Sequence, residues 1–142
     1  MIRSAGVLTW LRLARTYQKI QHAANTQLRS SGLSLAQFDV LAQVGAREGM
    51  TQQDLAEVLV VTKGNVCHLL DRMEQSGWIT RRPSGRANSL HLTPDGRALF
   101  DTVVPAHEAW VADQFQVLTP DEQTHLRSML HRLGRESSEL DE

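Results

Sequence analysis

Apolar residues recur along this chain at the three- and four-residue spacing of amphipathic helices. The first 33 residues carry one such stripe, which predicts a long helix, and Gly32 is suited to end it. The members of that stripe are Val7, Trp10, Leu11, Ala14, Tyr17, Ala24 and Leu28. A second helix is predicted from Ser34, because Gln37 three residues later completes a capping box. The inner face of this helix holds Phe38, Leu41 and Ala42.

Two shorter helices with a tight turn between them are predicted next. Residues 47–49 break the second helix, and Met50 is expected to form a one-residue strand. Thr51 is a suitable N-cap for the third helix, whose expected buried residues are Leu55, Ala56, Val58 and Leu59. After a turn at residues 60–61, Thr62 is predicted to cap a fourth helix that stops at residues 76–77. The fourth helix is expected to bury Val66, Leu69, Leu70 and Met73.

Residues 78–93 change to the alternating pattern of a β-hairpin. Trp78, Ile79 and Thr80 have strand character, and Leu90 and Leu92 alternate with polar neighbours. The turn is predicted at Pro83, Ser84 and Gly85. This segment is therefore expected to form a two-stranded wing with a basic tip.

Helical spacing returns after the hairpin. Thr93 with Pro94 behind it begins a fifth helix, which is expected to bend at Pro105. Its apolar residues are Leu99, Val103, Trp110 and Val111. Residues 119–122 begin a sixth helix with an N-cap, a proline and a capping-box glutamate, and its stripe is Leu126, Met129, Leu130 and Leu133. The predicted fold is mainly α with a small β-wing, in the order α-α-α-α-β-β-α-α.

Composition and charge narrow the class of protein. The 142 residues are 41% hydrophobic and 22% charged, which is typical of one folded domain. No apolar run approaches the roughly 20 residues that span a bilayer, no signal peptide is recognised and there is one cysteine, so we expect a cytoplasmic protein. The net charge of −1 conceals local excesses. Residues 1–33 are basic without an acid, residues 101–142 are strongly acidic, and the hairpin carries three unopposed arginines.

A short helix, a turn, a second helix and a basic hairpin indicate a winged helix-turn-helix that binds double-stranded DNA. The fourth helix would enter the major groove, where Asn65 could pair with adenine, Lys63 could reach guanine or phosphate, and Thr62 could meet phosphate. Arg86 suits the minor groove, while Arg81 and Arg82 suit phosphates. The predicted DNA-contacting residues are Ser34, Thr51, Gln52, Gln53, Thr62, Lys63, Gly64, Asn65, His68, Arg81, Arg82, Ser84, Arg86 and Asn88.

Four segments resemble the MarR family of multiple-antibiotic-resistance-type regulators. They are residues 33–41 (LSLAQFDVL), 51–56 (TQQDLA), 70–82 (LDRMEQSGWITRR) and 92–96 (LTPDG). The family often has an aspartate where this chain has Ser84, and the wing is about two residues short, so Arg86 is expected to be held less rigidly. The resemblance implies a winged helix-turn-helix lobe over residues 34–93, between dimerisation helices in residues 1–33 and 94–142 of a single domain.

The resemblance also implies a homodimer that binds a pseudo-palindromic operator, as a repressor in our interpretation. The predicted dimer contacts are Val7, Leu11, Trp110, Leu126, Met129, Leu130 and Leu133. The basic N-terminal and acidic C-terminal segments would complement each other across the interface, although a basic first helix lying near DNA explains the charges equally well. Family members often bind small aromatic acids, for which Arg12, Arg15, Tyr17, Phe38, His107 and Trp110 are candidates, unless these aromatic residues are plain core.

The cysteine and the histidines are the remaining candidates for functional chemistry. Cys67 lies in the fourth helix beside His68, which leaves a redox-responsive regulator as an alternative to ligand release. The six histidines are scattered and do not predict a metal site. Because no catalytic constellation or cofactor motif is present, we expect no enzyme activity, cofactor or metal. A helical protein-interaction module remains the alternative from another class.

Overall fold

The computed structural model describes residues 2–59 and 65–138, with side chains as far as residue 135. Over this part of the chain, the element order agrees with the predicted one. The elements are α1 (Ala5–Arg29), α2 (Leu35–Ala46), α3 (Gln52–Val58), α4 (Val66–Gln75), β1 (Ile79–Ser84), β2 (Ala87–Leu92), α5 (Pro94–Gln114) and α6 (Pro120–Ser138). The chain divides into two compact units, residues 1–108 and 109–142.

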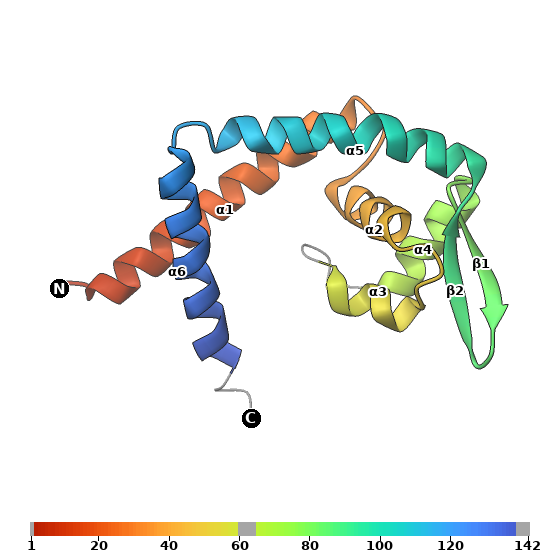
Figure 1. The fold of residues 1–142 in the computed structure, drawn as a ribbon, viewed down its shortest axis with the longest axis horizontal. Coiled ribbons are helices and arrows are strands. Elements are labelled where there is room, and N and C mark those ends of the chain that lie inside the picture. The colour runs from red at the N-terminus through yellow and green to blue at the C-terminus, as the bar shows by residue number, and fades with distance from the viewer. Residues whose placement is uncertain (1, 60–64, 139–142) are drawn as a thin grey trace. The chain divides into compact units, whose positions relative to one another are not determined.

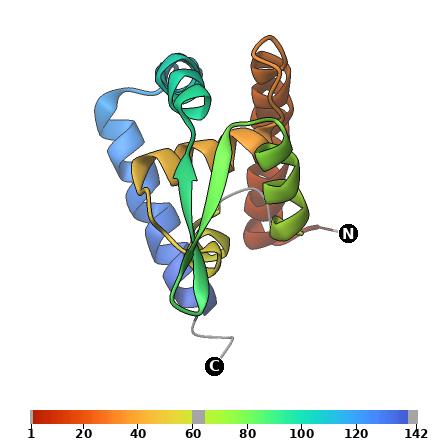
Figure 2. The same cartoon turned by 90° about the vertical axis from the view of Figure 1, so that its right-hand side faces the viewer.

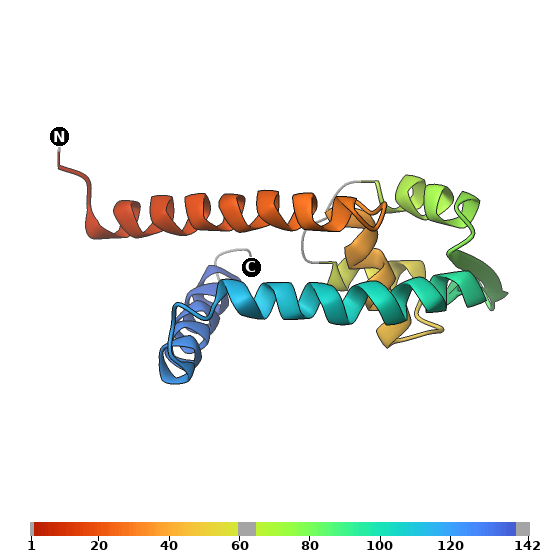
Figure 3. The same cartoon turned by 90° about the horizontal axis from the view of Figure 1, so that it is seen from above.

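The core of the first unit lies where α2, α3 and α4 pack beside the hairpin. Figure 1 shows these helices gathered next to β1 and β2, and Figure 2 shows the hairpin in front of α2. Figure 3 shows α1 as one uninterrupted helix leading into α2. Leu41, Leu55, Leu70 and Leu90 supply fully buried side chains from four different elements. At least one residue of each inner face predicted for the second, third and fourth helices is therefore buried in a core shared with the hairpin.

The end of α1 shows why the sequence places a glycine there. Gly32 has φ +75°, and its N–H donates to the Arg29 carbonyl at 3.0 Å. The Leu33 N–H donates to the Leu28 carbonyl at 3.3 Å, and both leucine side chains are buried. This Schellman turn confirms the predicted stop at Gly32. Gly77, with φ +79°, ends α4 in the same way.

The helix starts follow the predicted capping boxes. The Ser34 hydroxyl accepts from the Gln37 N–H at 3.1 Å, and the Gln37 side chain accepts from the Ser34 N–H at 3.0 Å. Thr119 forms the predicted reciprocal pair with Glu122, and Thr51, predicted only as an N-cap, forms one with Asp54. Each box satisfies two backbone N–H groups that the first turn of a helix leaves without partners.

The burial predicted for α3 is partly wrong. Ala56 and Val58 are exposed, Val58 by 38%, although both were predicted to be buried. Helix α3 has seven residues, and only Leu55 and Leu59, four apart, turn into the core. The predicted turn at residues 60–61 and the predicted cap Thr62 lie outside the described residues. In the described part, α4 begins at Val66 with Asn65 as its cap.

The hairpin is confirmed, but its turn is shifted. Ser84 pairs with Ala87 and Pro83 pairs with Asn88, so both residues belong to β1 and the prediction that they form the turn is wrong. The turn is made by Gly85 and Arg86, since Gly85 adopts φ +62°. Pro83 is tolerated because its missing N–H falls on the unpaired outer edge of the sheet.

The predicted one-residue strand is present, but it lies at Thr51, one residue after the expected Met50. The Leu90 N–H donates to the Met50 carbonyl at 2.8 Å, and the Gly49 N–H donates to the Leu90 carbonyl at 2.8 Å. An isolated bridge joins Thr51 to Ser89. The segment before α3 is therefore fixed to the wing.

Helix α5 begins as predicted, with the Gly96 N–H donating to the Thr93 hydroxyl at 2.9 Å. A Cβ atom on Gly96 would lie 2.0 Å from the Trp78 carbonyl oxygen, so only glycine allows this contact with the wing base. The bend expected at Pro105 does not interrupt α5, which continues from Pro94 to Gln114. Pro105 is exposed, and water can satisfy the carbonyl that its ring leaves without a donor.

Apolar residues remain exposed in both units. In the first unit, Val7, Trp10 and Tyr17 on α1 are exposed, whereas Ala24 and Leu28 nearer its end are buried. In the second unit, three members of the α6 stripe are exposed: Met129 by 45%, Leu130 by 41% and Leu133 by 53%. None of the helices described is long and apolar enough to cross a membrane.

Candidate DNA-contacting surface

The outward face of α4 is polar from its cap to its last turn. The residues on that face share the spacing i, i+3, i+7 and i+10 and are exposed: Asn65, His68, Arg72 and Gln75. Leu70 and Met73 on the opposite face are fully buried. Arg72 and Gln75 were missed by the sequence reasoning, although their spacing from Asn65 and His68 would have found them.

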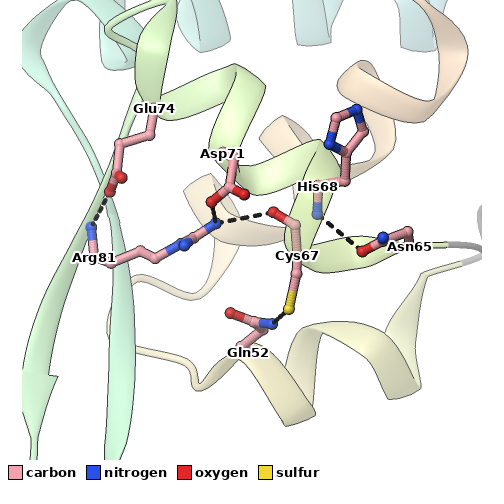
Figure 4. Close-up of polar contacts among 7 residues, drawn as sticks. All are labelled: Gln52, Asn65, Cys67, His68, Asp71, Glu74 and Arg81. Carbon is pink, nitrogen blue, oxygen red and sulfur yellow. Dashed lines mark hydrogen bonds and ion pairs between the residues drawn. The ribbon is translucent and has the colours of Figure 1, made fainter.

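Asn65 has a structural role as well as a predicted contact. Its Oδ1 accepts from the His68 N–H at 3.0 Å, which caps α4 (Figure 4). The amide keeps both hydrogens on Nδ2 and one lone pair on Oδ1. A bidentate contact with adenine would therefore have to form with the cap in place.

The structure places the Arg81 side chain against α4, within the lobe. Its Nη2 lies 2.7 Å from Asp71 Oδ1 and donates to the Cys67 carbonyl at 3.1 Å (Figure 4). The Arg81 N–H donates to Glu74 Oε2 at 3.2 Å. The sequence predicted that Arg81 would contact phosphate. No pattern in the sequence indicated that Asp71 and Glu74 on α4 would become its neighbours.

Gln52 connects the two helices of the helix-turn-helix. Its Nε2 lies 2.6 Å from Cys67 Sγ, which links the first turn of α3 to the first turn of α4. Gln52 is half-buried by this contact, whereas its neighbour Gln53 is exposed. Cys67 is an exposed free thiol.

Ser34 and Thr51, both predicted to contact DNA, cap the starts of α2 and α3. Ser34 is exposed and Thr51 is half-buried, and each hydroxyl accepts a backbone N–H of its own helix. The Thr51 N–H, followed by the Thr51 hydroxyl, holds the pKa of Asp54 below its ordinary value. The Arg47 guanidinium lies 3.9 Å from the same carboxylate and lowers its pKa further. Asp54 therefore holds the start of α3 through two contacts, one with the cap residue Thr51 and one with Arg47.

The wing offers an exposed basic tip. Arg82, Ser84 and Asn88 are exposed along the strands, and Arg86 is exposed in the turn between them. Within the described chain, nothing hydrogen-bonds or pairs with the Arg86 guanidinium. The remaining predicted contacts, Thr62, Lys63 and Gly64, lie outside the described residues.

The residues proposed from sequence for an effector are only partly brought together. The Phe38 and His107 rings meet with centroids 4.2 Å apart, and His107 Nδ1 lies 2.9 Å from Gln27 Oε1. Burial lowers the pKa of His107, and Glu108 partly opposes that shift. Tyr17, Arg12 and Arg15 are exposed on α1, and Trp110 belongs to the second unit. Phe38 and His107 are thus core residues where α1, α2 and α5 meet.

Metal ligands do not gather in the described part of the chain. No group of three or more histidine, cysteine, aspartate or glutamate side chains that could hold an ion occurs there.

A short helix, a second helix with a polar outward face and a basic hairpin define a winged helix-turn-helix DNA-binding protein. Residues 31–87, from the turn after α1 to the first residue of β2, match the model of the MarR family. An uncharacterized HTH-type transcriptional regulator of Bacillus cereus is 33% identical over 133 residues, which cover 93% of this chain and 90% of the relative. This chain belongs to the MarR family.

Solved structures agree with this assignment. A MarR family transcriptional regulator from Silicibacter pomeroyi has a TM-score of 0.81 and 26% identity, covering 95% of this chain and 99% of its own. The S. aureus MepR–DNA complex shares the fold, with a TM-score of 0.79 and 20% identity over 95% of this chain and 98% of its own. The protein is therefore a transcriptional regulator of the DNA-binding helix-turn-helix type.

Proposed function

We propose that this protein is a homodimeric repressor that binds a pseudo-palindromic operator through α4 and the wing. The observation that carries the proposal is the exposed polar face of α4 beside an arginine-tipped hairpin. A helix of this size fits the major groove, and an exposed arginine suits a narrow minor groove beside it. Two copies related by a two-fold axis would read half-sites about one helical turn, roughly 34 Å, apart.

Dimerisation is supported by the apolar residues that each unit leaves exposed. Beside the first turns of α6, an open, mainly apolar recess is lined by Leu118, Asp121, Glu122, His125, Leu126 and Met129. Leu130 and Leu133 continue the same stripe, and Val7 and Trp10 extend an exposed stripe on α1. Exposed apolar side chains that form a row along a helix are characteristic of protein interfaces. In this proposal, residues 1–33 and 94–142 form the dimer and residues 34–93 form the DNA-contacting lobe of a cytoplasmic regulator.

Release by a small aromatic acid is the regulatory part of the proposal. Phe38 and His107 connect α2 and α5 in the first unit, so a ligand that separates these rings would alter the support of the lobe. Arg12 or Arg15 would neutralise its carboxylate, and Tyr17 is the other candidate contact in the first unit. Thermal unfolding across a panel of phenolic acids tests this part, since a ligand that binds the folded state raises the melting temperature.

Fluorescence anisotropy with a labelled duplex from the region upstream of the gene tests the DNA-binding and dimer proposals together. We expect two protomers for each operator, a single dimer peak in light scattering, and weaker binding by Lys63→Ala and Arg86→Ala. A monomer that binds no duplex would refute the proposal and favour the helical protein-interaction module. Peroxide sensitivity that Cys67→Ser abolishes would instead favour redox control.

A further inference from the structure

We propose that Arg81 is a positioning residue that fixes the wing against α4 and does not itself contact DNA. Its partners on α4 are the Cys67 carbonyl, Asp71 and Glu74, and together with Arg81 they form what we name the α4–wing clamp (Figure 4). The inference rests on the proposed use of α4 and the wing as the DNA-contacting surface. It identifies the contact that sets the position of the wing relative to α4.

The clamp holds both the backbone and the side chain of Arg81. Cys67, Asp71 and Glu74 are spaced at i, i+4 and i+7, so they lie on one face of α4. The guanidinium reaches two of them, Asp71 Oδ1 at 2.7 Å and the Cys67 carbonyl at 3.1 Å. Glu74 Oε2 accepts the Arg81 backbone N–H at 3.2 Å. A residue bound through both its backbone and its side chain holds β1 in one position along the helix.

Burial separates Arg81 from the arginine next to it. The Arg81 side chain is 20% exposed, and its Nε is buried with no hydrogen-bond partner in the described part of the chain. Arg82 follows on the opposite side of the strand and is exposed. Asp71, which is 53% exposed, is therefore the main compensation for the buried charge of Arg81. Phosphate would have to compete with this carboxylate for Nη2 of Arg81.

The clamp also offsets negative charge on α4, the helix proposed to enter the major groove. Asp71 and Glu74 put two carboxylates on a helix that must approach phosphates, and unpaired acids there would oppose binding. Pairing with Arg81 neutralises Asp71 and ties Glu74 to the strand. The wing tip at Arg86 lies five residues further on, so its distance from α4 is set before DNA arrives. Preorganisation of this kind raises affinity by lowering the ordering cost of binding.

The test is a double-mutant cycle of Asp71→Ala and Arg81→Met, with operator affinity measured by anisotropy. If Arg81 contacts phosphate, removing the Asp71 carboxylate should leave binding unchanged or tighten it. If Arg81 is held by the clamp, Asp71→Ala should weaken binding, by about tenfold. In the Arg81→Met background the sign should reverse, because Asp71→Ala then removes an unpaired acid from the surface.

Footprinting supplies a readout that general destabilisation would not change. Hydroxyl-radical cleavage should return in the minor groove under the wings of the Asp71→Ala complex, while protection of the major groove under α4 remains. Thermal unfolding without DNA accompanies each variant, and the exposed position of Asp71 keeps this variant informative even if Arg81→Met does not fold. Arg82→Ala is the matched control, which should lower the salt dependence of binding and keep the wing footprint.

Binding by Asp71→Ala that equals or exceeds the wild type, with the wing footprint intact, would overturn the clamp and return Arg81 to the phosphate contacts. Failure of the proposed function has a different signature, since the wild-type protein would then bind no operator at all. That result would remove the basis of this inference as well.

Discussion

The apolar face of α4 and the apolar stripe of α6 have the same helical period, but only the first is covered. Leu70 and Met73 on α4 are fully buried, whereas Met129, Leu130 and Leu133 on α6 are 41% to 53% exposed. In the first unit, partners from α2, α3 and the wing come from the same chain and complete the core. Periodicity therefore predicts that a face will be apolar, and it does not say which surface will cover it.

This difference separates two kinds of contact in one protein. The winged lobe is built from contacts within a single copy, so damage there should appear as lost folding stability. The α6 stripe is the surface we assign to a second copy, so damage there should appear first as lost association. The following substitutions test that division in order of decreasing effect.

The same glycine-to-alanine change should have opposite consequences in the two regions. At Gly96 the new Cβ would lie 2.0 Å from the Trp78 carbonyl oxygen, so the wing base and α5 would have to separate. We expect a loss of about 3 kcal/mol or more in the free energy of unfolding, measured by urea denaturation. Gly134→Ala on α6 is the control, since its Cβ would meet nothing within 4 Å. Equal stability of the two variants would show that the close approach at Gly96 is not required.

Leu130→Asp should separate association from folding. A carboxylate in the α6 stripe should weaken the dimer by about 2 kcal/mol or more, because a charge would be buried in an apolar interface. Light scattering would detect monomer, and operator affinity would fall with it. Ser128→Asp adds the same charge on the other side of α6 and should leave the dimer intact. An unchanged dimer in Leu130→Asp would mean that the stripe is not the interface.

Asn65 allows capping to be separated from base contact. Asn65→Ala removes the acceptor for the His68 N–H and should cost about 1 kcal/mol of stability. Asn65→Ser keeps a capping oxygen and should restore most of that stability without restoring discrimination at an adenine. Unfolding curves and binding to single-base operator variants measure the two effects. If Asn65→Ser bound every variant as the wild type does, Asn65 would have a capping role alone.

The smallest expected effect is a pH dependence from His107. Burial lowers its pKa in the folded state, so the unfolded chain binds more protons as the pH falls below about 6.5. Folding stability should therefore decrease over that range and be fully recovered above it. His107→Gln should flatten the difference in melting temperature between pH 7.5 and pH 5.5. A wild-type profile as flat as that of the variant would contradict the assignment.

Local sequence chemistry predicted the elements well because each start and stop depends on residues close in the chain. Ser34 with Gln37, and Gly32 after α1, specify their turns through hydrogen bonds spanning a few residues. The wing turn was misplaced by the same reasoning. Pro83 is a common turn residue, but pairing with Asn88 holds it in a strand. Strand register depends on the partner strand, and that information is not local.

The candidate site was predicted less completely for a related reason. The polar face of α4 could be read from its period, yet Arg72 was overlooked on that very face. The role of Arg81 could not be read, because Asp71 and Glu74 become its neighbours only after β1 packs against α4. A basic residue in a wing has the same sequence signal whether it meets phosphate or a carboxylate of its own chain.

The most direct test of the DNA-contacting surface is the salt dependence of operator binding by the wild type and Arg86→Ala. Each phosphate neutralised by the protein steepens the fall of log K with log salt by about 0.9. We expect Arg86→Ala to bind more weakly with a shallower slope, whereas Arg132→Ala, on α6, keeps the wild-type slope. An identical affinity and slope for Arg86→Ala would contradict the assignment of the wing to DNA.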